Sequence, residues 1–352
     1  MKNNLFLLTI MLIVIISSCG NNSLIYKIPD FRDQYFFDCV KIEKSVSPSS
    51  FYKGNDIAFY DDIDLDIFLE ENKTLSFIII RNDSILYERY FYDTLRHPTT
   101  PIFSISKSFV SSLLGIAIEE GYIKSLKDPI TDYIPEIKGF FKDITLEMLL
   151  NMCSGLDCDG FMKVANIYFS TDLKKLINDY HIDRDPGKEY EYQNVNTLLL
   201  CMAIERATGT DISVFLEKEV WQKAGMSYDA TWSVDSKQHN QVKGFCGINA
   251  APIDLAKFGS IYLHDGYYNG NQIIPRQWVR ESFCKYNKLK DKDGYYYSYS
   301  WRITNANAFV AVGFLGQYVY IDPAKSLVIV RTGESYDSFN WIDFIEKMAR
   351  HL

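Results

Sequence analysis

The sequence lacks the signatures of nucleic-acid-binding and zinc-binding proteins. Its formal net charge is −8, and no segment gathers lysines and arginines into a basic stripe, which argues against a nucleic-acid-binding surface. None of its seven cysteines has the spacing of a zinc site, and its five histidines are scattered along the chain. We therefore expect neither nucleic acid as a partner nor a bound metal.

Low-complexity segments and internal repeats are also missing. Of the 352 residues, 47% are hydrophobic, 23% charged and 15% aromatic, which is the composition of a globular protein rather than a disordered or collagen-like one. A chain of this length can bury a large core, arranged as one large domain or as two ordinary ones.

The N-terminal apolar run, Leu5 to Ile16, is too short to cross a bilayer as a helix, which takes about 20 residues. It follows Lys2 and is typical of the apolar region of a secretory signal. The run ends in Ser17-Ser18-Cys19-Gly20, which resembles a bacterial lipobox. That resemblance implies cleavage of residues 1–18 and acylation of Cys19. We expect an exported lipoprotein of the cell envelope, with an ordinary signal peptide or an uncleaved anchor as alternatives.

Apolar periodicity predicts strands near both ends of the remaining chain and helices between them. After a polar lead-in that ends near residue 66, a hairpin is expected at 75–81 and 84–92, followed by a helix at 104–121. Further helices are expected at 146–152, 171–180, 195–207, 212–224, 253–265, 275–284 and 338–350. Late strands are expected at 295–303, 308–312, 318–322 and 327–331. This order indicates a sheet built from distant parts of the chain, with an inserted helical region.

The tetrapeptide Ser104-Ile105-Ser106-Lys107 stands at the first turn of the helix expected at 104–121. Residues three apart share one helix face, and the helix N-terminus favours negative charge on a serine oxygen. Apolar residues follow Lys107, so we expect its amine in a poorly hydrated cleft, where burial disfavours the ammonium and favours action as a base. A second Ser-x-x-Lys, Ser50 to Lys53, lies in the polar lead-in. Taken alone, Ser104 could equally be a helix-capping serine beside a solvated lysine.

A second candidate group is Tyr192-Gln193-Asn194. A tyrosine hydroxyl near a lysine can relay a proton, and an asparagine amide can hold a substrate carbonyl or the lysine. The other Tyr-x-Asn of the chain, Tyr267 to Asn269, lies between two Gly-containing turn signals and is predicted to be a surface turn.

Together these motifs resemble the pattern of the β-lactamase-related serine hydrolases, in which Ser-x-x-Lys is followed by Tyr-x-Asn. That family includes class C β-lactamases, D-alanyl-D-alanine carboxypeptidases, family VIII esterases and 6-aminohexanoate-dimer hydrolases. Segments 144–157, 254–259 and 313–323 are similar as well, so the resemblance spans roughly residues 75–352.

The resemblance implies an α+β, β-lactamase/transpeptidase-like fold: an antiparallel sheet flanked by helices, with an inserted helical subdomain. The single catalytic domain would span residues 67–352, after a lipid-anchored lead-in at 19–66. Its α/β part would comprise about 67–103 and 245–352, and its helical part about 104–244.

The resemblance also implies a reaction at the cleft between these parts. Ser104 would attack an ester or amide carbonyl, Lys107 would take its proton, and Tyr192 would assist proton transfer. Asn194 would contact the substrate. The oxyanion would be held by the N–H of Ser104 and by one from the strand that carries Phe314, Leu315 and Gly316. No cofactor is implied, because these groups supply every role.

One segment departs from the family pattern. Where β-lactamases and carboxypeptidases carry Lys-Thr-Gly or His-x-Gly, this chain reads Gly313-Phe314-Leu315-Gly316, with neither cation nor hydroxyl. We therefore expect a small-molecule or peptide substrate with an ester or simple amide bond, and poor binding of β-lactams. The alternatives are a carboxypeptidase or β-lactamase that takes its cation from elsewhere, such as Lys163 or Lys243, and a non-catalytic cell-wall-binding protein.

Several details stay open at this point. Cys153 and Cys158 are the nearest pair for a local disulfide, whereas Cys201 lies in an apolar run and is predicted to be a core residue. The tyrosine-rich stretch Tyr295 to Trp301 is expected mainly in the core, with lining of the acyl pocket as the alternative. The oligomeric state is undetermined, and a monomer is compatible with the sequence.

Overall fold

The computed structural model describes residues 29–57, 59–60, 63–92, 99–137, 139–157, 160–284, 289–335 and 339–352. The predictions for the signal peptide, for Cys19 and for Cys158 concern positions outside these ranges. In the described part, Cys153 carries a free thiol and Cys201 is buried, as predicted for a core residue. No helix within the described ranges is long and apolar enough to span a membrane.

The larger sheet has eight strands in the order β12-β13-β14-β15-β16-β5-β6-β2, and all neighbours except β2 and β6 are antiparallel. It unites the two distant parts of the chain, because β16 pairs with β5 from Leu327 opposite Arg81 to Gly333 opposite Thr74. The strands are β2 (Tyr52–Lys53), β5 (Thr74–Arg81), β6 (Ser84–Tyr90), β12 (Tyr296–Ser298), β13 (Trp301–Ile303), β14 (Phe309–Gly313), β15 (Gln317–Asp322) and β16 (Leu327–Gly333). The predicted hairpin and the sheet of chain ends are confirmed.

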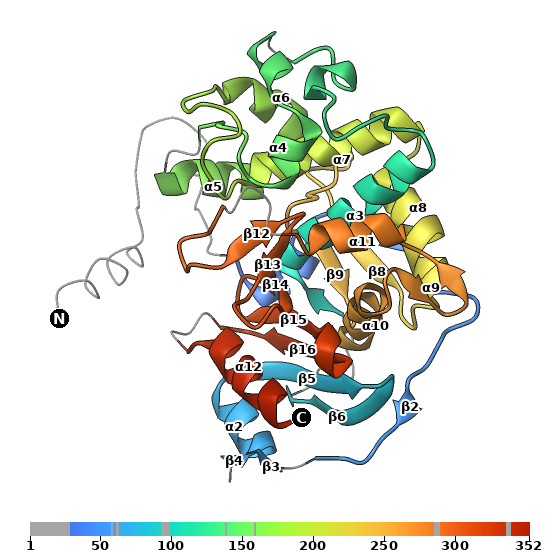
Figure 1. Ribbon diagram of the computed structural model, residues 1–352. Helices are drawn as coiled ribbons and strands as arrows, with labels where there is room; N and C mark the ends of the chain where they lie inside the picture. Colours follow the sequence, from blue (N-terminus) through green and yellow to red (C-terminus); the bar gives the residue numbers. More distant parts are fainter. Residues whose placement is uncertain are drawn as a thin grey trace, which may run out of the picture.

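Helices cover both faces of this sheet (Figure 1). On one face α10 (Pro252–Leu263) packs against β5, β15 and β16 as part of the main hydrophobic core. On the other, α2 (Leu65–Glu71) and α12 (Trp341–His351) bury a second cluster. Alternating strand residues supply both clusters: Ile78 and Ile80 face the first, Phe77 and Ile79 the second. This explains why 75–81 is apolar throughout.

A second, four-stranded sheet was not predicted; its order is β1-β8-β9-β7. Its strands are β1 (Cys39–Ile42), β7 (Thr100–Pro101), β8 (Ala230–Ser233) and β9 (Ile248–Ala250). In it Cys39 pairs with Ser233, so part of the segment expected as a lead-in is a strand of the folded unit. The sheet brings residues 100–101, just before the serine motif, beside residues 249–250.

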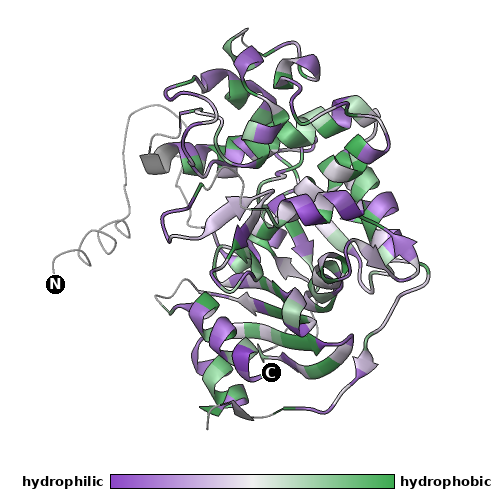
Figure 2. Ribbon diagram, in the orientation of Figure 1, coloured by the Kyte–Doolittle hydropathy of each residue, from purple (hydrophilic) through white to green (hydrophobic). Residues whose placement is uncertain are grey.

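Most of the helical part lies at the upper end of the molecule in Figure 1. Its helices are α3 (Ser106–Glu119), α4 (Leu146–Leu150), α5 (Gly160–Phe169), α6 (Leu173–Leu176), α7 (Asn194–Thr208), α8 (Ile212–Leu216) and α9 (Gln222–Ala224). Every residue of α3 from Ser106 to Ala117 is buried, so this helix is enclosed on all sides rather than amphipathic. Figure 2 shows the contrast with α12, whose purple residues face away from the sheet.

The sequence predicted most of these elements, but the helix expected at 171–180 is the short α6 followed by a 3-10 turn, Ile177–Asp179. Two further elements differ in detail. The strand expected at 295–303 is divided into β12 and β13 by a turn in which Tyr299 and Ser300 both have positive φ. The helix expected at 212–224 contains a wider π-helical stretch, Glu217–Trp221, between α8 and α9. Both are local changes in backbone conformation, which the spacing of apolar residues does not predict. The helix α11 (Arg276–Ser282) follows α10 as expected.

Candidate active site

Ser104 lies in a short 3-10 turn, Phe103–Ile105, that leads directly into α3. Phe103 has φ of +46°, a left-handed conformation that is unfavourable for a bulky residue and redirects the chain immediately before the serine. The aromatic rings of Phe103 and Phe314 meet edge to face, with centroids 5.8 Å apart. The serine is therefore presented at a sharp bend between the sheet and the start of a buried helix.

Lys107 occupies the first turn of α3 and is almost completely buried. Its Nζ donates to Ser104 Oγ at 3.0 Å and to the carbonyl oxygen of Phe245 at 2.7 Å. The Phe245 carbonyl thus holds the amine in addition to its contact with the serine. The predicted i,i+3 pairing of the two residues is thus present, and the alternative of a solvated lysine is excluded.

Tyr192 lies in the segment that leads into α7, whose first residue is Asn194. The Tyr192 ring centroid is 4.7 Å from Lys107 Nζ, and the side chain remains 41% exposed, so its hydroxyl can reach a ligand. Asn194 is half-buried beside it. The structure therefore brings the Ser-x-x-Lys and Tyr-x-Asn motifs together, although about 85 residues separate them in the sequence.

The Tyr192 segment is anchored to the 152–156 loop. The backbone N–H of Glu191 donates to the Met152 carbonyl at 2.7 Å, and Ser154 Oγ donates to Asn196 Oδ1 at 2.7 Å. The 152–156 loop therefore supports the position of the Tyr192 segment.

The predicted oxyanion segment lies at the end of β14, where Phe314, Leu315 and Gly316 turn the chain into β15. Phe314 and Gly316 line the cavity beside Ser104, whereas the Leu315 side chain is buried in the main core. Leu315 and Gly316 both have positive φ, and the Gly316 carbonyl accepts a hydrogen bond of 2.7 Å from Arg331 Nη1. Buried Arg331, which lies over the Trp341 ring, was not predicted as a contributor to this turn.

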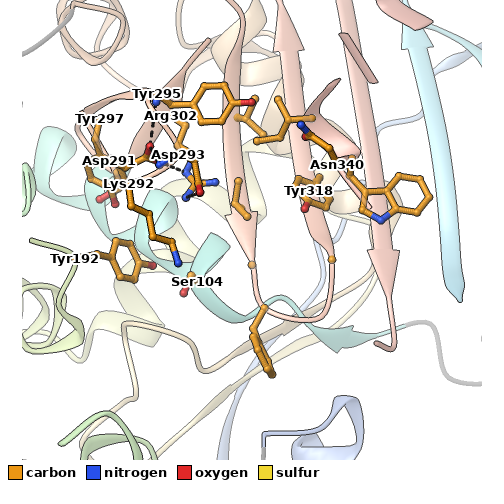
Figure 3. Close-up of a pocket in the computed structure, with 18 of the residues that line it drawn as sticks. Ser104, Tyr192, Asp291, Lys292, Asp293, Tyr295, Tyr297, Arg302, Tyr318 and Asn340 are labelled. Atoms are coloured by element: carbon orange, nitrogen blue, oxygen red, sulfur yellow. Dashed lines mark hydrogen bonds and ion pairs between the residues drawn. The ribbon is translucent and has the colours of Figure 1, made fainter. Parts of the chain in front are cut away.

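Ser104 opens into a cavity of about 1120 Å³ that runs along one face of β14 and β15 (Figure 3). Ser104 and Tyr192 lie at one end, and Tyr318 and Asn340 at the other. Within the stretch whose role was open, Tyr295 and Tyr297 line the cavity, whereas Tyr299 and Trp301 are buried in the core. Residues 290–293 and 339–342 also line it, and no sequence motif indicated them.

The geometry of these motifs agrees with the comparison to known proteins, in which residues 70–334 match the beta-lactamase family. The chain belongs to the beta-lactamase family. The 6-aminohexanoate-dimer hydrolase of Paenarthrobacter ureafaciens is 26% identical over 295 residues, covering 76% of this chain and 74% of that protein.

Solved structures of this family share the fold. A Bacillus anthracis protein provisionally assigned as a 6-aminohexanoate-dimer hydrolase superposes with a TM-score of 0.80 at 22% identity, over 95% of this chain and 97% of that one. A family VIII carboxylesterase gives 0.63 at 17% identity, over 82% and 95% of the chains. A class C β-lactamase gives 0.62 at 15%, over 82% and 93%. The protein is thus a serine hydrolase with the β-lactamase/transpeptidase-like fold, as the resemblance implied.

The other motif matches of this beta-lactamase-family chain lie outside the cavity. Ser50 is exposed next to β2 and is not among the described residues that line the cavity. Tyr267 to Asn269 belongs to the small hairpin of β10 (Tyr267–Tyr268) and β11 (Asn271–Gln272), which confirms the predicted surface turn.

Neither lysine proposed as a substitute for the missing strand cation is among the described residues that line the cavity. Lys243 is buried and donates to the carbonyl oxygens of Tyr168 and Ser170 at 2.8 and 3.0 Å. Burial lowers its pKa to about 8. Lys163 forms an ion pair with Asp157. Both have structural partners, so the structure does not favour a role for either in binding substrate.

One group of potential metal ligands exists in the described part of the family fold. Donor atoms of Asp172, Asp235 and His239 lie within 4.8 Å of one another. The Asp235 carboxylate already accepts backbone N–H groups of Leu173 and Gln241 at 2.9 and 3.0 Å. Asp235 therefore links the segments around Leu173 and Gln241, and this structural role accounts for the cluster.

Proposed function

We propose that this protein hydrolyses an ester or amide bond through an acyl-enzyme on Ser104. The observation that carries the proposal is the 3.0 Å contact between Lys107 Nζ and Ser104 Oγ, made by a lysine that is almost completely buried. A nucleophile within hydrogen-bond reach of a base that is itself oriented by a third group is the arrangement that activates a hydroxyl. Here the third group is the Phe245 carbonyl.

In the first half-reaction, Ser104 Oγ forms a bond to the substrate carbonyl carbon while its proton moves to Lys107 Nζ. The carbonyl π electrons move to oxygen, and this oxyanion accepts hydrogen bonds from the N–H of Ser104 and from one N–H of the 314–316 turn. One such donor contributes about 10²–10³ in rate. Collapse of the intermediate breaks the bond to the leaving group, which takes its proton through the Tyr192 hydroxyl.

In the second half-reaction, a water molecule attacks the acyl carbon and gives its proton to the base system of Lys107 and Tyr192. Collapse of this second intermediate breaks the bond to Ser104 Oγ, which regains a proton as the acid product leaves. Asn194, the first residue of α7, is proposed to contact the substrate, although it is half-buried and is not among the described residues that line the cavity. Every proton is exchanged among side chains, substrate and water.

The proposed substrate is an ester or a simple amide. The closing segment Gly313 to Gly316 offers no cation or hydroxyl to a ligand, in contrast with the Lys-Thr-Gly of β-lactamases. The names of the relatives agree with this range, since one is a hydrolase of the 6-aminohexanoate dimer and another is a family VIII carboxylesterase. We expect low activity towards penicillins.

Intact-mass spectrometry after reaction with a fluorophosphonate probe tests the activated serine. The wild-type protein should gain one adduct, and Ser104→Ala should gain none. Lys107→Met should react at least about a hundredfold more slowly, because a general base contributes about 10²–10⁴. Ser50→Ala, at the exposed second Ser-x-x-Lys, is the matched control and should label like the wild type. A folded wild type that stays unlabelled would overturn the proposal.

We also propose that the protein is an exported lipoprotein. The support is the sequence Ser17-Ser18-Cys19-Gly20 after an apolar run. In a bacterial host, the wild type should fractionate with membranes and carry lipid on an N-terminal cysteine. Cys19→Ser should lose the lipid, and an unmodified protein starting at residue 1 would exclude the idea.

A further inference from the structure

Two neighbouring aromatic side chains near the N-terminal end of the described chain face the solvent. Tyr35 is 66% exposed and Phe36 is 61% exposed, and we refer to these two residues as the aromatic pair. A single apolar side chain on a surface is ordinary, whereas two adjacent rings leave a larger apolar area in water. Val164 on α5 is also exposed, one helical turn before Tyr168 on the same face of that helix.

The segment that carries the aromatic pair is held firmly against α5. The Tyr168 hydroxyl donates to Asp33 Oδ2 at 2.8 Å, and Asp33 is a buried residue of the 3-10 turn Phe31–Tyr35. The N–H of Phe36 donates to the carbonyl oxygen of Asp33 at 2.9 Å. Phe37 meets the Tyr168 ring edge to face, with centroids 5.3 Å apart. Because the backbone on both sides of the pair is fixed, little conformational entropy is lost when the pair contacts a partner.

The outer ring of Phe36 rests on other rings. Its centroid lies 5.0 Å from that of Phe37 and 6.4 Å from that of Phe169, at the end of α5, and both contacts are edge to face. The ring is thus supported from the protein side, while most of its surface faces outward.

The charged side chains next to the aromatic pair in sequence have partners of opposite charge. Arg32 contacts Asp30 at 2.8 Å, and Asp38 contacts Lys237 at 3.5 Å. An isolated charge beside the pair would make contact with an apolar partner unfavourable, because that charge would lose its hydration. The pairing of these charges removes much of this obstacle.

The position of the aromatic pair in the chain indicates which partner it contacts. The proposed lipid anchor, Cys19, precedes the first described residue, Pro29, by ten positions. A chain extends by at most about 3.3–3.6 Å per residue, so the acylated thiol lies within about 36 Å of Pro29 whatever the conformation between them. A globular unit of about 320 residues has a radius of gyration of about 20 Å and a diameter of about 50 Å. The anchor therefore keeps the face near Pro29 beside the bilayer, and the opposite face cannot touch it.

We propose that Tyr35 and Phe36 insert into the surface of the lipid bilayer that holds the Cys19 anchor, and that they fix the orientation of the catalytic domain on the membrane. This inference rests on the proposed lipoprotein and is independent of the reaction at Ser104. Aromatic side chains suit this position because the ring enters the apolar region while a tyrosine hydroxyl stays hydrated. The acyl chains and the aromatic pair bury apolar area in the same membrane, so their contributions to binding add.

Quenching of tryptophan fluorescence by brominated lipid tests the insertion. The five native tryptophans are all buried, so subtracting the wild-type emission isolates an indole added by Phe36→Trp. The lipidated protein, purified from bacterial membranes, is reconstituted into phosphatidylcholine vesicles with and without bromine on the acyl chains. The Phe36→Trp indole should emit at shorter wavelength on vesicles and lose most of its added fluorescence when the lipid is brominated. Bromine quenches at contact, so this loss requires an indole within the bilayer.

Tyr52→Trp is the matched control. Tyr52 is exposed on β2, and β2 lies on the opposite side of the molecule from α5 in Figure 1. The Tyr52→Trp indole should emit like a hydrated one and stay unquenched. Equal quenching at the two positions would mean that no face is preferred and would overturn the proposal. An emission shift in Phe36→Trp that grows with protein concentration, without quenching, would assign the aromatic pair to contact with a second copy and also contradict it.

The same preparations separate this inference from the other two proposals. Mass spectrometry of the N-terminal peptide reports lipid on Cys19, and the fluorophosphonate probe reports Ser104. Phe36→Trp should label like the wild type, because Phe36 is not among the described residues that line the cavity. A lipidated protein whose Phe36→Trp indole is unquenched would refute this inference alone. A protein without lipid on Cys19 would remove the tether and overturn both membrane proposals, whatever the labelling of Ser104.

Discussion

A Cβ atom added to Gly313 would lie 2.4 Å from the carbonyl oxygen of Ile102, the residue two positions before Ser104. No side chain tolerates that separation, so the end of β14 and the serine bend approach as closely as two backbones can. The contact sets the distance between the nucleophile and the 314–316 turn, the two parts that would share an oxyanion.

Gly313→Ala should therefore separate these two parts and slow catalysis. A displacement of about 1 Å at reacting groups can cost about 10²-fold, so we expect kcat/KM for 4-nitrophenyl butyrate to fall by about that factor. Gly139→Ala is the control, since a Cβ there meets open space, and it should retain wild-type kcat/KM. Wild-type kinetics in Gly313→Ala would show that the two segments tolerate separation.

Tyr192→Phe should lower kcat more for substrates with poorer leaving groups. A 4-nitrophenolate leaves without a proton, so its ester should lose little, whereas an ethyl ester or an anilide should lose about 10²–10⁴ in kcat. Tyr190→Phe is the matched control, because Tyr190 lines the same cavity. Its ring centroid lies 5.2 Å from that of Tyr297, a ring that Tyr192 also contacts. Equal losses for both leaving-group classes would argue against a role in proton transfer.

Local patterns in the sequence predicted the parts of this site that depend on short spacing. Ser104 and Lys107 are three residues apart at a helix start, so one helical turn brings them together wherever the helix lies. Tyr192 required the family resemblance, because its position beside Lys107 depends on contacts of the 191–196 segment with the 152–156 loop. No spacing rule connects positions so far apart in the chain.

The cavity beyond Ser104 could not be predicted, for a related reason. Its walls include residues 290–293 and the start of α12, and these meet only after the eight-stranded sheet has formed. The pairing of Cys39 with Ser233 in the second sheet was missed likewise, because β1 follows a polar, irregular segment.

The Asp254–Lys257 ion pair on α10 should contribute strongly to stability. Their side chains are fully buried, 3.2 Å apart, and Asp254 also accepts the N–H groups of Ser227 and Tyr228. Burial raises the pKa of Asp254 and lowers that of Lys257. Lys257→Met should reduce the free energy of unfolding by about 3–5 kcal/mol, because it leaves a buried carboxylate unpaired.

Urea denaturation measures this effect, and Asp254→Asn combined with Lys257→Met should cost less than the sum of the single changes. Lys347→Met, which removes an exposed i,i+4 partner of Asp343 on α12, should change stability by less than about 1 kcal/mol. A Lys257→Met protein as stable as the wild type would mean that Asp254 is satisfied by its backbone donors alone.

The buried amine of Lys243 should make stability rise between pH 7.5 and 9. Burial lowers its pKa from an ordinary value of 10.5 to about 8, so above pH 8 the folded protein releases a proton that the unfolded chain still holds. Stability increases with pH wherever the unfolded state binds more protons. The neighbouring Cys246 thiol stays protonated in the folded state here, because burial raises its pKa to about 12.

Relative to Lys243→Met, the wild-type free energy of unfolding should increase by about 1 kcal/mol between pH 7.5 and 9 in urea titrations. Lys237→Met, at an exposed lysine, should follow the wild type. A constant difference between wild type and Lys243→Met would mean that the amine keeps its proton when buried.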